Sequence, residues 1–474
     1  MTSTLLPANP PGVTEHAPRW ALPILLSGTV MIVLDFFVVN VALPSMQQRL
    51  HAGTAALEWV VAGYGLTFAA LMVTAGRLGD RFGRRRVFVW GLVLFGITSA
   101  LCGLAPDPAV LVAARCLQGA AGALISPTVL SLIGVMFQGP DRVRAISVYG
   151  LAMGVAAAGG QLLGGVLLQA DIAGSGWRTI FLINVPIAVW AAVAARRVIP
   201  ESRAEQPPGL DPTGVVLVTA GLVALVLPLV QGRELGWPAW TWASLALAPV
   251  ILAGFVRHQH RTERSGGTPL LAPSLFAARQ LRAGLATQLG FWCGQAALFL
   301  VVALYLQDGR GLDPLQAGLV FTILAAAYLV ASVKAPALTL RFGRDLVGLG
   351  ALLLAAGEGG LAAGVAAGGT HCPLVALVPG LLAAGAGMGL CITPLTTVVL
   401  AHADPERAGA VSGALSTMQQ VGNAVGVAVT GMIFFGNAAH GAGRAFTLSA
   451  LELAALLVGV AGLSRLLPSR RSLA

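Results

Sequence analysis

Residues 20 to 43 read WALPILLSGTVMIVLDFFVVNVAL, a run of about 24 residues whose one ionisable side chain, Asp35, lies near its middle. A helix rises about 1.5 Å per residue, so about 20 such residues cross the roughly 30 Å hydrocarbon core of a bilayer. The run is too long for the apolar core of a secretory signal, and it lacks a clear cleavage site. We therefore expect a first membrane span that stays in the protein.

The rest of the chain repeats this pattern. Of the 474 residues, 56% are hydrophobic and only 10% are charged, and the mean hydropathy is +0.82. Ordinary soluble domains carry about 25% charged residues. The composition predicts an all-α membrane protein with fourteen transmembrane helices. These spans are expected near 20–43, 58–76, 87–105, 109–137, 145–169, 178–196, 213–231, 239–256, 283–306, 316–338, 346–367, 373–400, 408–435 and 445–466.

The basic residues predict the orientation. If the N-terminus is inside the cell, 23 of the 29 lysines and arginines fall in cytoplasmic segments, as the positive-inside rule requires. The net charge of +10 is then a topology signal, so we expect no nucleic-acid partner. We predict a multi-pass protein of the cytoplasmic membrane, in contact with the lipid bilayer, with both termini in the cytoplasm.

The domain organisation is predicted from two polar segments, at 199–212 and 257–282, and from two pairs of similar sequence stretches. GDRFGRRRV (79–87) resembles LRFGRDLV (340–347), and GALISP (122–127) resembles GLCITP (389–394), which indicates an internal repeat. We therefore expect two six-helix bundles with two inserted helices between them. The predicted parts are a tail (1–19), an N-terminal bundle (20–198), a linker (199–212), an inserted helix pair (213–256), a cytoplasmic loop (257–282), a C-terminal bundle (283–467) and a tail (468–474).

The sequence lacks the motifs of nucleotide hydrolysis, metal binding and nucleophilic catalysis. The chain's one lysine, Lys334, follows a valine, so no Gly-Lys pair of a phosphate-binding loop exists. The five cysteines form no CxxC pair, and no nucleophile motif GxSxG occurs. We expect no enzyme activity, no metal site and no cofactor. Without a phosphate-binding loop, the energy source that we expect for this membrane protein is the proton motive force.

Asp35 and Arg115 are the candidate proton-coupling residues. A carboxylate within a span costs several kcal/mol when it is ionised in lipid, and such residues are functional by default. Arg115, in the fourth span, stays charged and needs a partner. Asp35 could carry a proton against that fixed charge, or the two could form a static pair that packs helices. Asn40, nearby on the first span, could bind substrate or only bond a neighbouring helix.

Three further groups are singled out. The segment GRLGDRFGRRRV (76–87) is interpreted as a cytoplasmic loop in which Asp80 pairs with arginines across a closing gate. The fifth span carries closely spaced glycines, among them Gly154, that would let helices approach and slide, although generic packing explains them too. Glu358 and Glu452 are further intramembrane acids that could bind a proton or a cationic substrate, or form salt bridges.

At these residues the chain resembles the major facilitator superfamily, and within it the fourteen-span drug:proton antiporters. LDFFVVNVALP (34–44) resembles the first-span signature, and RCLQGAAGA (115–123) resembles the fourth-span signature through Arg115, Gln118 and Gly119. The resemblance implies alternating access between two bundles and multidrug export of hydrophobic or cationic compounds in exchange for protons. The superfamily's loop signature is carried by Gly76, Gly79, Asp80, Arg81, Gly83, Arg84 and Arg85.

Two positions depart from that family. Its antiporter motif usually reads Gly-Pro-x-x-Gly-Gly, whereas Gln161 replaces the proline between Gly160 and the pair Gly164 and Gly165. The first-span signature usually has threonine where this chain has Phe37, which adds aromatic surface beside the candidate proton site. We expect an exporter of hydrophobic or amphipathic compounds. Gln161 favours the alternative of an importer or uniporter without proton exchange, and a non-transporting membrane sensor or scaffold is a second alternative.

Overall fold

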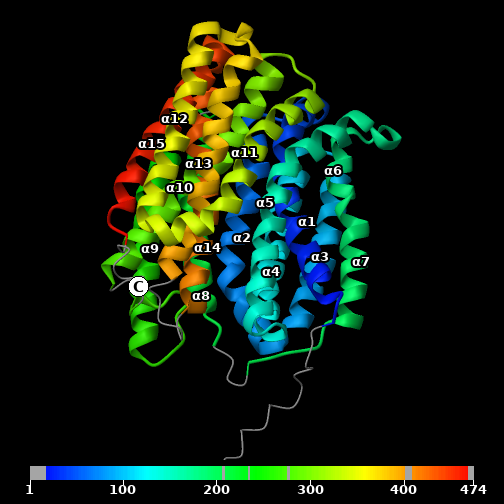
Figure 1. The fold of residues 1–474 in the computed structure, drawn as a ribbon, viewed down its shortest axis with the longest axis vertical. Helices are drawn as coiled ribbons and strands as arrows, with labels where there is room; N and C mark the ends of the chain where they lie inside the picture. Colours follow the sequence, from blue (N-terminus) through cyan, green and yellow to red (C-terminus); the bar gives the residue numbers. More distant parts are fainter. Residues whose placement is uncertain (1–17, 205–208, 233–234, 275–277, 401–407, 468–474) are drawn as a thin grey trace, which may run out of the picture.

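The computed structural model describes residues 18–204, 209–232, 235–274, 278–400 and 408–467. Within these ranges the regular structure is entirely helical (Figure 1). The first half contains α1 (Ala21–Leu50), α2 (Thr54–Phe82), α3 (Arg84–Gly103), α4 (Pro108–Met136), α5 (Gly139–Ala170), α6 (Thr179–Leu182) and α7 (Asn184–Val198). The inserted pair is α8 (Pro212–Gln231) and α9 (Ala239–Arg264). The second half contains α10 (Arg279–Leu304), α11 (Pro314–Phe342), α12 (Arg344–Gly368), α13 (Leu374–Leu400), α14 (Ala408–Asn437) and α15 (Ala442–Ser464).

The predicted fold class is confirmed. Among the described residues, 13 helices are long and apolar enough to cross a membrane, or up to 14 if the bent α5 is one span. That helix bends by 42° between its parts Arg144–Ala157 and Gly159–Ala170. The sixth span, Gly176–Val198, is interrupted at Ile183, so it consists of a short turn, α6 and α7.

The predicted loop at 76–87 is wrong in its secondary structure. Helix α2 continues to Phe82 and α3 begins at Arg84, so Gly83 alone makes the turn. Its φ of 109° is open to glycine and strained for other residues. The polar residues of this segment remain helical because a helix satisfies its own backbone groups in water as well as in lipid.

The helices pack as two groups with the inserted pair beside them. Helices α1 to α7 pack mainly on one another, and α10 to α15 do the same (Figure 1). The two groups meet where α2 packs on α14 and α5 packs on α11. Helices α8 and α9 pack together, and α8 also contacts both α2 and α14. The inserted pair therefore covers one of the two seams between the halves.

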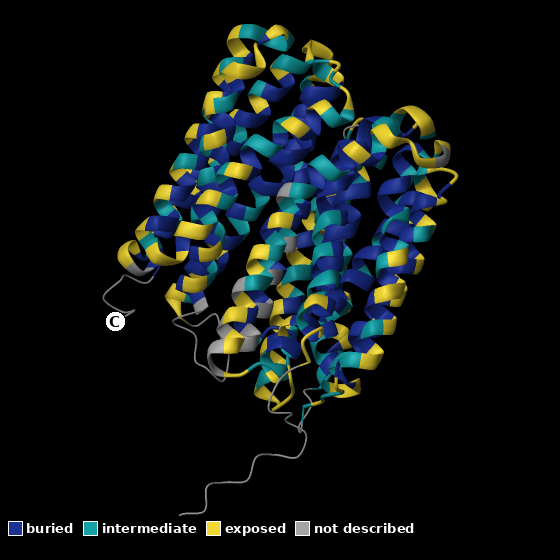
Figure 2. Cartoon of the chain, turned by 45° about the vertical axis from the view of Figure 1, so that its right-hand side comes forward, coloured by how far each residue is buried: buried dark blue, intermediate teal, exposed yellow. Residues whose placement is uncertain are grey.

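The burial pattern is that of a protein surrounded by lipid. Exposed residues alternate with buried ones along the outer helices (Figure 2). Large apolar side chains such as Trp90, Trp190 and Val250 are about half exposed or more. In the membrane-spanning stretch that contains α10, 83% of the most apolar 18 residues are buried inside the protein, against 17% in α9. Helix α10 is thus central and α9 is peripheral.

One end of the molecule gathers the linker and the loop that follows α9, and we call it the linker face. There the Arg84 backbone N–H donates to Ser202, and the Arg77 guanidinium donates to the carbonyls of Gly209 (2.8 Å), Thr268 (2.9 Å) and Pro269. Arg77 therefore ties α2 to both segments that flank the inserted pair.

Asp211 fixes the inserted pair at the same face. Its carboxylate accepts from the Gly214 and Leu270 backbone N–H groups and from the Gln259 amide, and His258 Nε2 lies 2.8 Å from it. Burial acts to raise the pKa of Asp211, but these hydrogen bonds outweigh it and hold the pKa below its ordinary value.

The two halves touch most closely away from the linker face. Helix α5 ends, and α11 begins, at the opposite face. A Cβ added at Gly165 would lie 2.5 Å from the Pro314 carbonyl oxygen, and one added at Gly318 would lie 2.9 Å from the Gln161 carbonyl oxygen. The backbones of α5 and α11 are therefore in direct contact near the opposite face.

Candidate functional site

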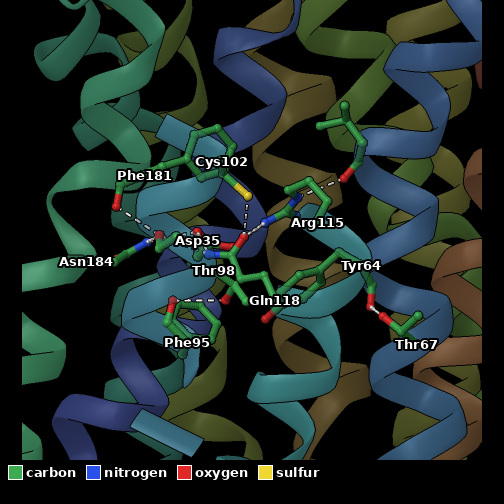
Figure 3. A network of polar contacts seen from close by, with 12 residues as sticks. Asp35, Tyr64, Thr67, Phe95, Thr98, Cys102, Arg115, Gln118, Phe181 and Asn184 are labelled. Carbon is green, nitrogen blue, oxygen red and sulfur yellow. Dashed lines mark hydrogen bonds and ion pairs between the residues drawn. The ribbon is translucent and has the colours of Figure 1, made fainter. Parts of the chain in front are cut away.

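A buried ion pair lies inside the first half. Asp35 on α1 and Arg115 on α4 are 1% and 0% exposed, and Arg115 Nη1 donates to Asp35 Oδ2 over 2.6 Å (Figure 3). Arg115 Nε also donates to the Val60 carbonyl of α2 at 2.9 Å. Three helices are thus joined through one guanidinium, whose charge has a buried counter-ion.

Two amides complete the surroundings of the carboxylate. Gln118 Nε2 and Asn184 Nδ2 each donate to Asp35 Oδ1 at 2.9 Å. Both amides also donate to Ser99 Oγ, whose hydroxyl donates to the Phe181 carbonyl at 2.9 Å (Figure 3). The carboxylate therefore accepts hydrogen bonds from α4 and from the α6–α7 region at once.

Arg115, Gln118 and Asn184 all donate hydrogen bonds to Asp35, and this determines how the site responds to a proton. A carboxylate accepts every one of these bonds, whereas a protonated carboxyl presents an O–H that needs an acceptor. Taking up a proton therefore forces at least one donor to turn away. Since that donor belongs to another helix, the charge of Asp35 is linked to the packing of α1 against α4 and α7.

Aromatic rings extend the site toward the second half. The Arg115 guanidinium lies 4.3 Å from the centre of the Tyr64 ring, a cation–π contact. The rings of Phe36 and Phe37 follow Asp35 on α1, and Phe37 lies edge-on to Phe299 of α10, with ring centres 4.8 Å apart. Phe37, the position that departs from the family signature, therefore makes a direct contact between the two halves.

Gly119 allows the close approach of α2 and α4. A Cβ at this position would lie 2.2 Å from the Tyr64 carbonyl oxygen and 2.4 Å from Thr67 Oγ1. Thr67 in turn donates to the Cys116 carbonyl of α4 at 2.7 Å. A side chain at Gly119 would push the helices apart and move Arg115, one turn away, from its acceptor on α2.

The glycines of α5 contact both halves. Cβ atoms added at Gly160 and Gly164 would meet Phe37 and Val38 of α1 at 3.0 and 2.9 Å. Those added at Gly154 and Gly165 would meet Tyr328 and Pro314 of α11 at 2.9 and 2.5 Å. Helix α5 thus lies between α1 and α11 with little room on either side.

Gln161 and Asn40 stand apart from the ion pair. The Gln161 side chain is fully buried, and neither of its amide atoms has a hydrogen-bond partner among the described residues. The Asn40 amide donates to the Phe37 carbonyl of its own helix at 3.4 Å. The described contacts therefore leave Asn40 outside the network around Asp35.

The residues of the loop signature, Gly76 to Arg85, make their described contacts within the first half and the linker, apart from the bonds of Arg77 given above. Asp80 Oδ1 accepts from Arg84, four residues on, at 2.7 Å, and the Arg85 N–H donates to Glu201 at 3.1 Å. Gly79 lies against Thr128 of α4. In this structure the described ion-pair partner of Asp80 is Arg84, on the next helix of the same half; pairing of Asp80 with arginines across a closing gate stays a prediction.

Sequence reasoning missed Ser99, Asn184 and Tyr64. Each is a neutral residue in an apolar span, so none of them stands out by its charge. Asn184 lies in the LINVP stretch (182–186), where an amide before a proline was the available signal. Glu358 and Glu452 lie in the second half, away from the Asp35 network. The described residues include no group of three His, Cys, Asp or Glu side chains that could hold a metal ion.

Comparisons with known proteins agree on one family. A sequence model described as Major Facilitator Superfamily matches residues 25–427. A probable actinorhodin transporter of Streptomyces coelicolor is 42% identical over 92% of this chain and 77% of its own length. The tetracenomycin C resistance and export protein of Streptomyces glaucescens is 33% identical, covering 90% and 79% of the two chains.

A solved structure shares the fold at low identity. The D-xylose-proton symporter superposes with a TM-score of 0.69 at 17% identity, covering 95% of this chain and 98% of the other.

Proposed function

Since this chain belongs to the Major Facilitator Superfamily, we propose that it exports hydrophobic or amphipathic small molecules from the cell in exchange for protons. The Asp35 network is the observation that carries the proton coupling. It holds a carboxylate that can be neutralised only by rearranging contacts between helices. Substrate export is supported by relatives whose names state transport of actinorhodin and export of tetracenomycin C.

The linker face is the cytoplasmic side in this proposal. The excess of basic residues in the segments at that face supports this orientation. Backbone contact between the halves near the opposite face supports loading of substrate from the cytoplasm in this conformation. Each elementary charge moved through about 100 mV supplies about 2.3 kcal/mol, so the membrane potential can drive export without ATP.

An apolar hollow offers a place for such a substrate. It has a volume of about 460 Å³ and lies between α1 and α5. On α1 its lining includes Val30 and Leu34, the residue next to Asp35, and on α5 it runs from Val148 to Leu163. The hollow is open on one side, where Leu151 and Val155 of α5 are about half exposed, so a lipophilic compound could enter it and contact α1 and α5 through apolar side chains.

The test is energised efflux of a fluorescent lipophilic cation from whole cells or inverted vesicles. Wild-type export should stop with a protonophore and with Asp35→Asn. An uncoupled uniporter, the alternative that Gln161 favours, would remain active in Asp35→Asn. A sensor or scaffold would bind compounds without flux in any preparation.

A further inference from the structure

The second half contains two acids that the Asp35 site does not use. Glu358 on α12 is 0% exposed, and neither of its carboxylate oxygens has a hydrogen-bond partner among the described residues. Glu452 on α15 is partly exposed and accepts from Thr430 Oγ1 at 3.0 Å. Helices α12 and α15 pack antiparallel, with Gly348 against Ser464 at one end and Gly369 against Gly443 at the other, so Glu358 and Glu452 lie at the same level of the pair.

These acids have no described cation to balance them. The ionisable side chain near Glu452 is Cys293 on α10, while Glu58 of α2 lies against Gly431, next to Thr430. Within the described ranges, none of these groups is positive and neither acid forms an ion pair. Two ionised carboxylates this close in a buried region would repel each other and lose hydration, so at least one of them must hold a proton.

In the internal repeat, Glu358 and Glu452 hold positions equivalent to those of polar residues at or beside the Asp35 site. Helices α3 and α12 each begin with an arginine directly after a glycine of positive φ. Thr98 and Glu358 are each fourteen residues beyond that arginine, and Thr98 is followed by Ser99. Asn184 and Glu452 hold similar places in the spans Gly176–Val198 and Ala442–Ser464. Where the first half has neutral donors, the second half has acids.

A neighbouring hydroxyl also lacks a partner. Ser449 is fully buried on α15, three residues before Glu452 and therefore on the same helix face. Its Oγ has no hydrogen-bond partner among the described residues. A hydroxyl can donate to a carboxylate or accept from a protonated carboxyl, so it suits a group that alternates between the two forms.

We propose that Glu358 and Glu452 together form a second proton-binding site, whose proton is exchanged in the transport cycle in addition to the one on Asp35. Glu452, being partly exposed, receives and releases the proton, and the enclosed Glu358 shares it. In the first half the coupling acid is paired with a cation, whereas the two acids of the second half have no cation beside them among the described residues. Only the exchange rests on the proposed function; the binding does not.

Infrared spectroscopy of the purified full-length protein tests the binding. At neutral pH the wild type should show a protonated-carboxyl C=O band that shifts in D₂O. Glu358→Gln should remove this band, and Glu452→Gln should change its position because the neighbouring carboxyl is replaced by an amide. Asp35→Asn and Asp313→Asn, at an exposed acid of α11, should leave it in place. A band that survives Glu358→Gln unchanged overturns the site.

Proteoliposomes test the exchange. With a pH difference of about one unit and no membrane potential, each exchanged proton contributes about tenfold to the steady-state gradient of a permanently charged lipophilic dye. Glu358→Gln should therefore lower that gradient about tenfold, while Asp313→Asn, at an exposed acid, keeps the wild-type value. An unchanged gradient in Glu358→Gln shows that the pair exchanges no proton. If the wild type builds no gradient, the proposed function fails, and the infrared band still decides the binding.

Discussion

Asp35→Asn is the substitution that probes the site most directly. Asp35 accepts one N–H from a guanidinium at 2.6 Å and two from amides at 2.9 Å. Asparagine keeps one acceptor oxygen, but its own N–H groups then face donors, and Arg115 is left as a buried charge without a counter-ion. Breaking a buried ion pair in this way costs about 3–5 kcal/mol. We expect the free energy of unfolding to fall by about that amount, because Arg115 retains only neutral acceptors.

The transport consequence is measured by dye efflux from energised cells. Asp35→Asn should lower efflux to the level that a protonophore leaves in the wild type, because the network then has no side chain that alternates between a charged and a neutral form. Asp313→Asn is the matched control, because Asp313 is an exposed N-cap residue of α11 outside the network. Protonophore-sensitive efflux at the wild-type rate in Asp35→Asn would refute the reasoning.

Three further predictions concern packing and the linker face. Gly119→Ala should lower thermal stability in detergent by about 1–3 kcal/mol, because its Cβ would overlap the backbone of α2, whereas Gly150→Ala, which meets no atom within 4 Å, should not; equal melting temperatures would contradict this. Arg77→Ala removes the bonds that tie α2 to the segments flanking α8 and α9, so limited proteolysis in those segments should become faster. The pKa of Asp211 is depressed by its hydrogen bonds in the folded protein, so its stabilisation is present above the ordinary carboxyl pKa and is lost as the pH falls through the folded value. Hydrogen exchange around α8 should therefore rise on acidification, and in Asp211→Asn it should already be high at neutral pH and change little.

The spans could be predicted from sequence because lipid leaves the backbone few choices. A run of apolar residues must satisfy its own N–H and C=O groups in the bilayer, so length and hydropathy nearly determine the helices. Asp35, Arg115, Glu358 and Glu452 stood out for the same reason, since an ionisable residue in such a run is costly. The partners Ser99 and Asn184 were missed because neutral polar residues carry no such cost and occur widely in spans.

The segment 76–87 shows what sequence patterns cannot predict. Charged residues and glycines at 76–87 are typical of a loop, yet a helix can continue beyond the bilayer because water also tolerates it. Whether Asp80 pairs with Arg84 or with a residue of the other half depends on which cation is nearest in three dimensions. Spacing along the chain does not contain that distance.

The chain of rings from Phe36 through Phe37 to Phe299 has a consequence for leakage. Protons hop along files of water or hydroxyl groups that both give and take hydrogen bonds, and a phenyl ring does neither. Phe36 and Phe37 follow Asp35 on α1 toward the opposite face, so on this side of the carboxylate their rings offer no group through which a proton could hop. Phe37, the aromatic residue that departs from the family signature, thus adds a surface beside Asp35 that does not conduct protons, which limits uncoupled leakage of protons through the protein.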